Sequence, residues 1–393
     1  MAAPDWSQLH RDILQHISQK LNSEFYQIRF RSVCSSWRSS IPKNYHHYLN
    51  LPLKFPIPSD DDSNSNSNSK NTFHFSKRNL FLIIPPPNQE TLHPWLIKIG
   101  PDSHHQTHLW HPLSRDKQLP FHFHDVIDFN QHRVIHLGTE FVFDDLPSSS
   151  LSRNNMEKIV VFDADTWHIG KGKVSCSVLL TIHVSGKLAV FRCGDQRWTL
   201  IPEMSAAYDD VCVFNGRPFA VDSNGRTVAV GLDLRLDLVA ESVFGGNKKF
   251  LVESDGELLL VDKYLTNVQH EGFLDDHVDG GGNYGIRFGR KRAVKFDVFR
   301  LDKMRKKWVA VRNLRDRVLF LGEGCAFSAL ASDLGMENGN CVIYKDEAFR
   351  HVHFTGLGVR VFCLDKHRIS PLVDFPHYTK LFWPPPEWIK LRW

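Results

Sequence analysis

Arg29-Phe30-Arg31-Ser32-Val33-Cys34-Ser35-Ser36-Trp37-Arg38 closes the first of two parts into which this 393-residue chain divides by composition. The stretch from Asp5 to Ile41 contains neither glycine nor proline, whereas all 24 glycines lie beyond residue 99. Glycine and proline are the residues least favourable inside helices. This composition therefore favours a short helical module, followed by a much larger body of a different fold class.

Apolar residues of the module recur at the spacing of one helix face. A first stripe runs from Leu9 to Leu21, a second helix begins after Asn22-Ser23, and a third ends before Pro42. Asp5 followed by Gln8 resembles a capping box at the start of the first helix. Three helices this short bury little apolar surface alone, so the module either shares its core with a partner protein or packs against the rest of the chain.

Residues 51–72 have the composition of a linker. Prolines stiffen the segment from Leu51 to Pro58, and an acidic Ser/Asn tract follows from Asp60 to Asn71. A tract of this kind has no apolar side chains to bury, so we expect it to be a disordered spacer.

From residue 73 onward, short β-type runs alternate with turn signals. Leu179–Val184 and Leu188–Arg192 flank Ser185-Gly186, and Phe250–Val252 and Leu258–Val261 flank Asp255-Gly256, so each pair predicts a hairpin. Turns at Asn215-Gly216 and Asn224-Gly225 predict three further strands around them. Leu232, Leu234, Leu236 and Leu238 alternate with polar residues and predict one more strand.

One internal repeat sets the expected architecture. Val190-Phe191-Arg192 leads through a polar turn to Trp198, and Val298-Phe299-Arg300 leads in the same way to Trp308. The copies are 108 residues apart, which suits two units of the roughly 40–50 residues typical of propeller blades. We therefore predict an all-β domain over residues 73–393, a β-propeller of six to eight blades, with a pair of β-sandwiches as the alternative.

Composition limits the compartment and the partners. The seven cysteines are far apart and include no C-x-x-C pair, which favours a reducing environment. The N-terminus lacks the pattern of a secretory signal, and no apolar run approaches the ~20 residues that cross a bilayer. We expect a protein of the nucleus or cytoplasm with no membrane partner.

A basic segment stands out against the small net charge of +4. Residues 287–317 contain 13 Lys and Arg against 3 Asp and Glu. Nuclear import or an acidic partner are the functional interpretations, with nucleic acid unlikely. The alternative is a solvated hairpin rim, since lysine at strand edges also discourages aggregation. The candidate patch is Arg290, Lys291, Arg292 and Lys295.

Two sequence patterns resemble ligand-binding motifs but lack the surrounding residues that such sites need. Gly280-x-Gly282-x-x-Gly285 has no strand-turn-helix frame, so we interpret it as an inter-strand loop rather than a phosphate site. His104, His105, His108 and His111 cluster with only Asp102 among them, which makes a zinc site improbable. No Gly-x-Ser-x-Gly motif is present. We therefore expect no catalytic residue, no cofactor and no metal.

The helical module resembles an F-box. The resemblance rests on Leu9-x3-Ile13-Leu14-x2-Ile17-x3-Leu21 and on Ile28-Arg29-Phe30-Arg31-x-Val33-Cys34-x2-Trp37-Arg38. His10 stands where the family usually has proline after leucine, and we expect this departure to loosen the start of the first helix and to weaken adaptor binding. The resemblance assigns residues 1–50 to the F-box. The adaptor-binding residues that it implies are Leu9, Ile13, Leu14, Ile17, Leu21, Ile28, Val33 and Trp37.

The body looks like the plant F-box family with a C-terminal KIB-type β-propeller. The most specific match is Asp316-Arg317-Val318-Leu319-Phe320-Leu321-Gly322-Glu323-Gly324-Cys325-Ala326-Phe327-Ser328. Others are His93-Pro94-Trp95-Leu96-Ile97-Lys98, Pro112-Leu113-Ser114-Arg115 and Leu381-Phe382-Trp383-Pro384-Pro385-Pro386-Glu387-Trp388. The resemblance covers nearly the whole chain except the Ser/Asn tract.

By this resemblance, the chain is a noncatalytic substrate-recognition subunit of an SCF-type cullin–RING ubiquitin ligase. The F-box would bind a Skp-type adaptor, and the propeller would recruit an unidentified target protein. The alternative is a protein that acts outside the ligase, as a binding inhibitor of a kinase or transcription regulator.

Overall fold

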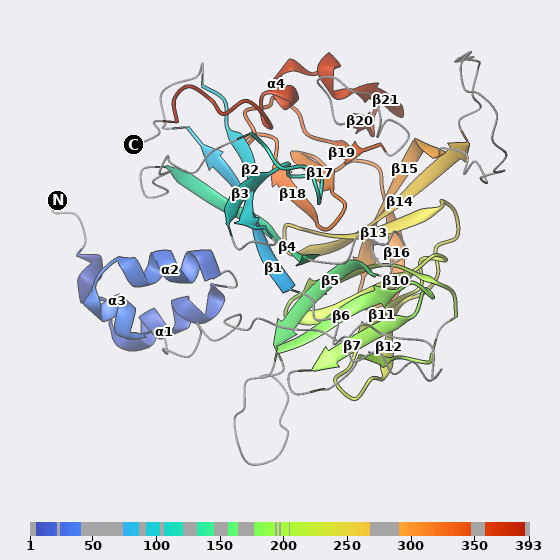
Figure 1. The fold of residues 1–393 in the computed structure, drawn as a ribbon, viewed down its shortest axis with the longest axis horizontal. Coiled ribbons are helices and arrows are strands. Elements are labelled where there is room, and N and C mark those ends of the chain that lie inside the picture. The colour runs from blue at the N-terminus through green and yellow to red at the C-terminus, as the bar shows by residue number, and fades with distance from the viewer. Residues whose placement is uncertain are drawn as a thin grey trace, which may run out of the picture.

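The chain folds into a small helical module beside a ring of five β-sheets, as a computed structural model shows (Figure 1). The structure describes residues 5–21, 24–40, 74–85, 92–102, 106–120, 132–144, 156–163, 177–192, 195, 198–203, 205–267, 291–346 and 358–389. The predicted linker, the glycine pattern at 280–285, His104, His105 and Arg290 lie outside these ranges. Within them, none of the helices has the length and apolar character that crossing a membrane requires.

The module contains the three predicted helices. They are α1 (Arg11–Lys20), α2 (Glu24–Ser32) and α3 (Ser35–Ser40), preceded by the 3-10 turn η1 (Trp6–Gln8). Asp5 caps η1 rather than α1, since its carboxylate accepts a hydrogen bond from the Ser7 N–H at 3.0 Å. The predicted capping box is therefore wrong in detail: the helix itself begins after His10.

The five sheets are the blades of a propeller. Blade one contains β4 (Arg133–Asp144), β1 (His74–Ile84), β2 (Trp95–Pro101) and β3 (Thr107–Trp110), in order from the ring centre outward. Blade two contains β5 (Met156–Asp163), β6 (Ser177–His183), β7 (Leu188–Arg192) and β8 (Thr199–Leu200). Blade three contains β9 (Tyr208–Phe214), β10 (Arg217–Asp222), β11 (Thr227–Val230) and β12 (Leu236–Ala240).

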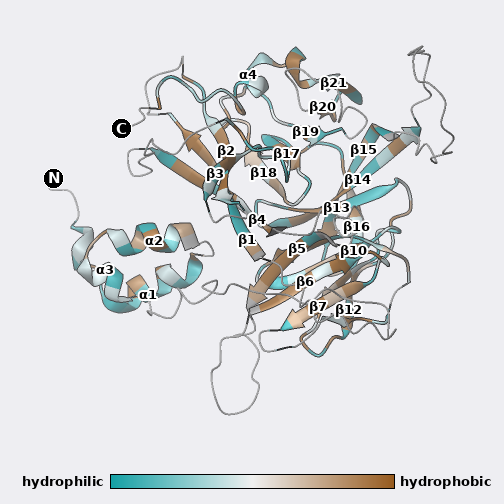
Figure 2. Cartoon of the chain, in the orientation of Figure 1, coloured by the Kyte–Doolittle hydropathy of each residue, from teal (hydrophilic) through white to brown (hydrophobic). Residues whose placement is uncertain are grey.

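The last two blades complete the ring. Blade four contains β13 (Lys248–Ser254), β14 (Glu257–Asn267), β15 (Lys291–Asp302) and β16 (Lys307–Val311). Blade five contains β18 (Ala326–Leu330), β17 (Arg317–Leu321), β19 (Cys341–Lys345), β20 (Val359–Cys363) and β21 (Arg368–Pro371). The 3-10 turn η6 (Leu372–Asp374) and helix α4 (Pro376–Thr379) follow. Figure 2 shows hydrophobic residues along many of the propeller strands, where the blades pack face to face.

The ring closes after five blades, so the prediction of six to eight is wrong. The innermost strands contact one another in the order β4, β5, β9, β13 and β18, and β18 returns to β4. The repeated Val-Phe-Arg strands are β7 and β15, the third strands of blades two and four. Two blades thus span 108 residues, about 54 each. The assumed period was too short because blade four has strands of 11 and 12 residues joined by residues 268–290.

The hairpin predictions are confirmed, and the alternating leucines are a partial error. β6 with β7, β10 with both β9 and β11, and β13 with β14 pair antiparallel as expected. The strand predicted over Leu232–Leu238 begins only at Leu236, because the chain turns before it. Leu234 has a φ of 66° in this turn, and the Asp233 carboxylate accepts from the Arg235 N–H at 3.2 Å.

The C-terminal segment anchors blade one. The Trp95 indole N–H donates to the Phe382 carbonyl at 2.9 Å, and the Leu96 N–H donates to the Leu381 carbonyl at 2.8 Å. The C-terminal segment is therefore hydrogen-bonded to β2 of blade one.

A buried ionic network lies at the same junction. The Lys98 ammonium lies 2.6 Å from the Glu140 carboxylate, with both side chains at most 2% exposed. From blade five, Glu323 accepts from the Arg115 N–H at 2.8 Å and from the Lys345 ammonium at 2.7 Å. Gly324 approaches Glu140 so closely that a Cβ atom there would overlap the carboxylate. Each ion pair lies within one blade, and hydrogen bonds from the Arg115 backbone N–H to Glu323 and from the Lys345 ammonium to the Ser114 hydroxyl join the first and last blades.

Candidate docking face and axial pocket

The helical module has a small core of its own. Leu14 is fully buried and Phe30 is 5% exposed, and Leu9, Ile17, Leu21 and Trp37 pack around them. The rings of Phe30 and Trp37 lie 4.5 Å apart between centroids. These side chains hold the three helices together, which the apolar stripe alone did not reveal.

Other apolar side chains of the module point into solvent. Trp6 is 62% exposed, and Ile13, Ile28 and Val33 are each at least 50% exposed. Ten large hydrophobic residues are exposed in the described part of the chain, and these four fall within its first 33 positions. Contiguous exposed apolar side chains mark interaction surfaces, and these four are the module's candidates for such a surface. We call Trp6, Ile13, Ile28 and Val33 the docking face.

The structure therefore divides the eight residues implied to bind an adaptor. Ile13, Ile28 and Val33 belong to the docking face. Leu14 lies inside the module and presents no surface to a partner. The remaining four are partly buried against Leu14 and Phe30: Leu9, Ile17, Leu21 and Trp37. Trp6 is not among the eight predicted residues, although its position one turn before the apolar stripe was a usable signal.

His10 replaces the usual proline without distorting the backbone. Its φ is −61° and its ψ is 141°, and it serves as the N-cap of α1, where its Nδ1 accepts from the Asp12 N–H at 3.4 Å. Proline fixes φ near −65°, so His10 already has the conformation that proline would impose. The backbone at His10 therefore shows none of the loosening that we expected at the start of the first helix.

Helix α2 packs against blade one through two aromatic residues. The ring of Phe25 lies 4.9 Å from that of Phe81, between centroids. The Tyr26 hydroxyl accepts a hydrogen bond from the backbone N–H of His136 in β4 at 2.9 Å. Figure 1 shows the helices beside β1 and β4. The module is thus seated on the propeller, so self-packing and an exposed docking face coexist.

A β-bulge makes this contact possible. Along β1 and β4, Leu80 pairs with Gly138 but Phe81 pairs with His136, so Leu137 has no partner across the ladder. A bulge disrupts the hydrogen bonding of its strand and redirects a side chain. Here the neighbouring His136 N–H is available to Tyr26, and Leu137 points into a pocket.

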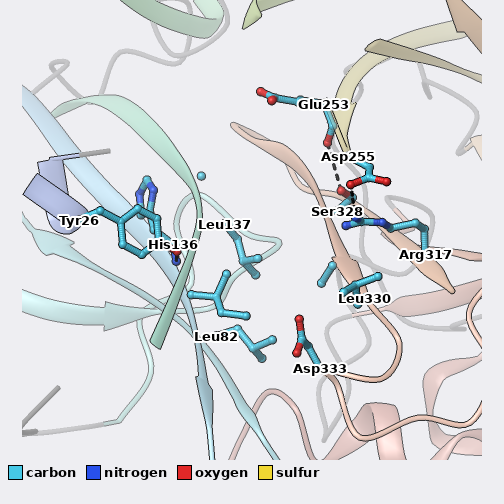
Figure 3. Close-up of a pocket in the computed structure, with 13 residues that line it drawn as sticks. Tyr26, Leu82, His136, Leu137, Glu253, Asp255, Arg317, Ser328, Leu330 and Asp333 are labelled. Carbon is cyan, nitrogen blue, oxygen red and sulfur yellow. Dashed lines mark hydrogen bonds and ion pairs between the residues drawn. The ribbon is translucent and has the colours of Figure 1, made fainter. Parts of the chain in front are cut away.

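This pocket has a volume of about 380 Å³ and lies between α2 and the inner strands of blades one, four and five. Figure 3 shows Tyr26, His136 and Leu137 on one side and Glu253, Asp255, Arg317, Ser328 and Leu330 on the other. We call it the axial pocket. Its lining residues are Tyr26, Leu82, Ile135, His136, Leu137, Gly138, Glu253, Asp255, Arg317, Ser328, Ala329, Leu330 and Asp333.

The rim of the axial pocket is acidic. Of its three carboxylates, Asp255 pairs with Arg317 at 2.9 Å and Asp333 pairs with Arg133 at 3.1 Å. Glu253 is exposed to solvent, and its carboxylate makes no hydrogen bond or ion pair with the described residues; desolvation by the surrounding residues raises the pKa of its carboxyl. The Glu253 backbone is fixed, because its carbonyl accepts from the Ser328 hydroxyl at 3.1 Å. The pocket therefore has one negative charge without a partner in the described structure.

The remaining sequence candidates do not form a site in the described part of the chain. His108 pairs with Asp102 at 2.8 Å, while His111 is buried against Phe382 with a ring separation of 5.1 Å. No group of three potential metal ligands occurs there. In the basic patch, Arg292 and Lys295 are exposed, and Lys295 pairs with Asp297 at 2.8 Å. Lys291 begins β15, and Arg290 is not described.

Comparison with known proteins places this geometry in a family. The F-box domain family matches residues 6–47, and the family described as KIB1-4 beta-propeller matches residues 73–365. The chain is an F-box protein of the KIB1-4 β-propeller family.

Relatives of this F-box protein share both parts. The chain is 41% identical to F-box protein SKIP23 of Arabidopsis thaliana over 98% of its own length and 95% of the relative's. It is 34% identical to F-box protein At2g17036 of the same plant, with the same coverage. A third relative, Putative F-box/kelch-repeat protein At5g24040 of Arabidopsis thaliana, is 24% identical over 98% of both chains.

Proposed function

We propose that this F-box protein is the noncatalytic substrate-recognition subunit of an SCF-type ubiquitin ligase. The F-box docks a Skp-type adaptor and, through it, the cullin–RING ligase, while the propeller recruits a target protein. The docking face is the observation that supports this proposal, because a helical module with a closed core still leaves four large apolar side chains in water.

The energetics suit an adaptor complex. Full burial of one large apolar side chain is worth roughly 1.5–3 kcal/mol. The four docking-face residues are at least half exposed, so completing their burial contributes on the order of 3–6 kcal/mol before association costs are subtracted.

Recruitment by itself accelerates ubiquitination without chemistry in this chain. Holding a target near the charged enzyme raises its effective concentration. Because Phe25 and Tyr26 seat the F-box on blade one, a target bound to the propeller has a defined position relative to the adaptor.

Binding of purified Skp-type adaptor tests the proposal. We expect the wild type to bind, and Ile13→Asp with Ile28→Asp to weaken binding at least tenfold. The matched control is Val373→Asp, which places the same charge on an exposed apolar residue (67% exposed) of η6. Absence of wild-type binding, or equal binding by all three proteins, refutes the adaptor role. Leu14→Asp is unsuitable, because it disrupts the module's core.

The same variants address action outside the ligase. Ile13→Asp with Ile28→Asp is expected to abolish adaptor binding. If this double variant still inhibits a kinase or transcription regulator, and the ubiquitination level of that partner is unchanged, the protein acts as a binding inhibitor instead.

A further inference from the structure

We propose that the axial pocket receives a single lysine or arginine side chain from the protein that this receptor recruits. The inference rests on the proposed function and adds the chemistry by which the target is recognised.

Charge is the first argument. Arg317 and Arg133 compensate Asp255 and Asp333, whereas Glu253 has no partner among the described residues. A cation at the rim would supply this partner. The three carboxylates and the two arginines that pair with them leave a net charge of −1, which favours a cation over an anion.

The walls are the second argument. Five apolar residues line the cavity together with the carboxylates. They are Leu82, Ile135, Leu137, Ala329 and Leu330. Lysine and arginine combine an aliphatic stem, which packs along apolar surface, with a cation at its end. The aromatic ring of Tyr26 adds a face that attracts cations.

Size and rigidity are the third argument. A cavity of about 380 Å³ lies at the lower end of the range for ligand pockets, which suits one long side chain rather than a helix. The cavity is formed before binding: Ser328 holds the backbone of Glu253, and Arg317 holds Asp255. Little ordering is then needed when a side chain enters, which favours affinity.

Peptide binding to the full chain tests the inference. The probes are fluorescein-labelled, acetylated heptapeptides with randomised flanks and Lys, Arg, norleucine or Glu at the centre. We expect the Lys or Arg pool to bind at least tenfold more tightly than the norleucine and Glu pools. Glu253→Gln should reduce that preference at least fivefold.

A neighbouring carboxylate supplies the control. Glu257→Gln alters the same β13–β14 hairpin outside the pocket lining and should leave the preference unchanged. Equal affinities for the Lys and norleucine pools, or a preference that survives Glu253→Gln, overturns the inference. Two further outcomes also overturn it. Free lysine amide that binds as tightly as the peptides would identify a small cation as the occupant, and self-association that depends on Glu253 would identify a second copy of the chain.

Failure of the inference can be told apart from failure of the proposed function. Adaptor binding is measured separately on the docking-face variants. If the adaptor binds but the Lys and Arg peptide pools are not preferred, only the pocket assignment is refuted. If the wild type does not bind the adaptor, the ligase role is refuted.

Discussion

The hydroxyl of Tyr26 accepts a hydrogen bond at 2.9 Å from the backbone N–H of His136, a residue 110 positions further along the chain. The donor lies beside the bulge at Leu137, where the pairing of β1 with β4 shifts. One contact therefore ties the F-box to the propeller, completes the hydrogen bonding of a disrupted strand and forms one wall of the axial pocket.

Tyr26→Phe should loosen this joint without unfolding either part. Removing the hydroxyl deletes one hydrogen bond worth about 0.5–1.5 kcal/mol. We expect the amide of His136 to exchange with deuterium about fivefold faster, as peptide-resolved hydrogen exchange would measure. Tyr264→Phe, in blade four, is the control. Unchanged exchange at His136 in Tyr26→Phe would show that the contact does not hold the joint.

His10→Pro should preserve or strengthen the F-box. His10 has a φ of −61° and the preceding Leu9 has an extended ψ of 136°, which suit a proline at position 10. Proline reduces the conformational freedom of the unfolded chain, so we expect about 0.4–1 kcal/mol of stabilisation.

The measurement for His10→Pro is adaptor affinity, with His10→Gly as the control that lacks both the fixed φ and the side-chain cap. The proline variant should bind within about twofold of the wild type or more tightly, and the glycine variant more weakly. A proline variant that binds tenfold more weakly would contradict the backbone argument.

Glu140→Gln should destabilise the propeller strongly. It leaves the Lys98 ammonium buried without its carboxylate partner, and breaking a buried pair in this way costs about 3–5 kcal/mol. Lys98→Met combined with Glu140→Gln removes the buried charge and should recover most of that loss. Urea unfolding followed by tryptophan fluorescence gives both values. A cost below about 1 kcal/mol for Glu140→Gln would refute a structural role for the pair.

His111 should make the fold sensitive to acid. Burial, reinforced by the Lys98 and Lys345 ammonium groups, lowers the pKa of His111 to about 3. An unfolded histidine has a pKa near 6.5, so between these values the unfolded chain binds the extra proton. The stabilising contribution is therefore complete above about pH 6.5 and is lost as the pH falls toward 3. Between pH 7 and pH 5 the loss is about 2 kcal/mol.

His111→Asn isolates this effect. Asparagine keeps an acceptor for the Leu113 N–H, which donates to the His111 Nδ1 at 3.2 Å, but it does not titrate. The difference in unfolding free energy between pH 7 and pH 5 should therefore be about 2 kcal/mol smaller in the variant than in the wild type. Identical pH profiles would exclude His111 as the source.

Much of the fold followed from local sequence. Helical spacing located α1, α2 and α3, and turn residues between β-type runs located the hairpins of blades two, three and four. These features depend on neighbouring residues alone. The leucines at 232 and 234 mark the limit, because alternation continues through a turn whose conformation depends on Asp233.

The sequence by itself determined that the chain has an F-box, that its body is a β-propeller, and to which family it belongs. Tertiary structure decided which of two adjacent stripe residues is buried, since Leu14 is fully buried and Ile13 is 50% exposed. It also decided the number of blades, the contact between Tyr26 and His136 and the axial pocket. Helix and strand periodicity arises between near neighbours, whereas these features depend on how segments far apart in sequence pack, for which no local pattern exists.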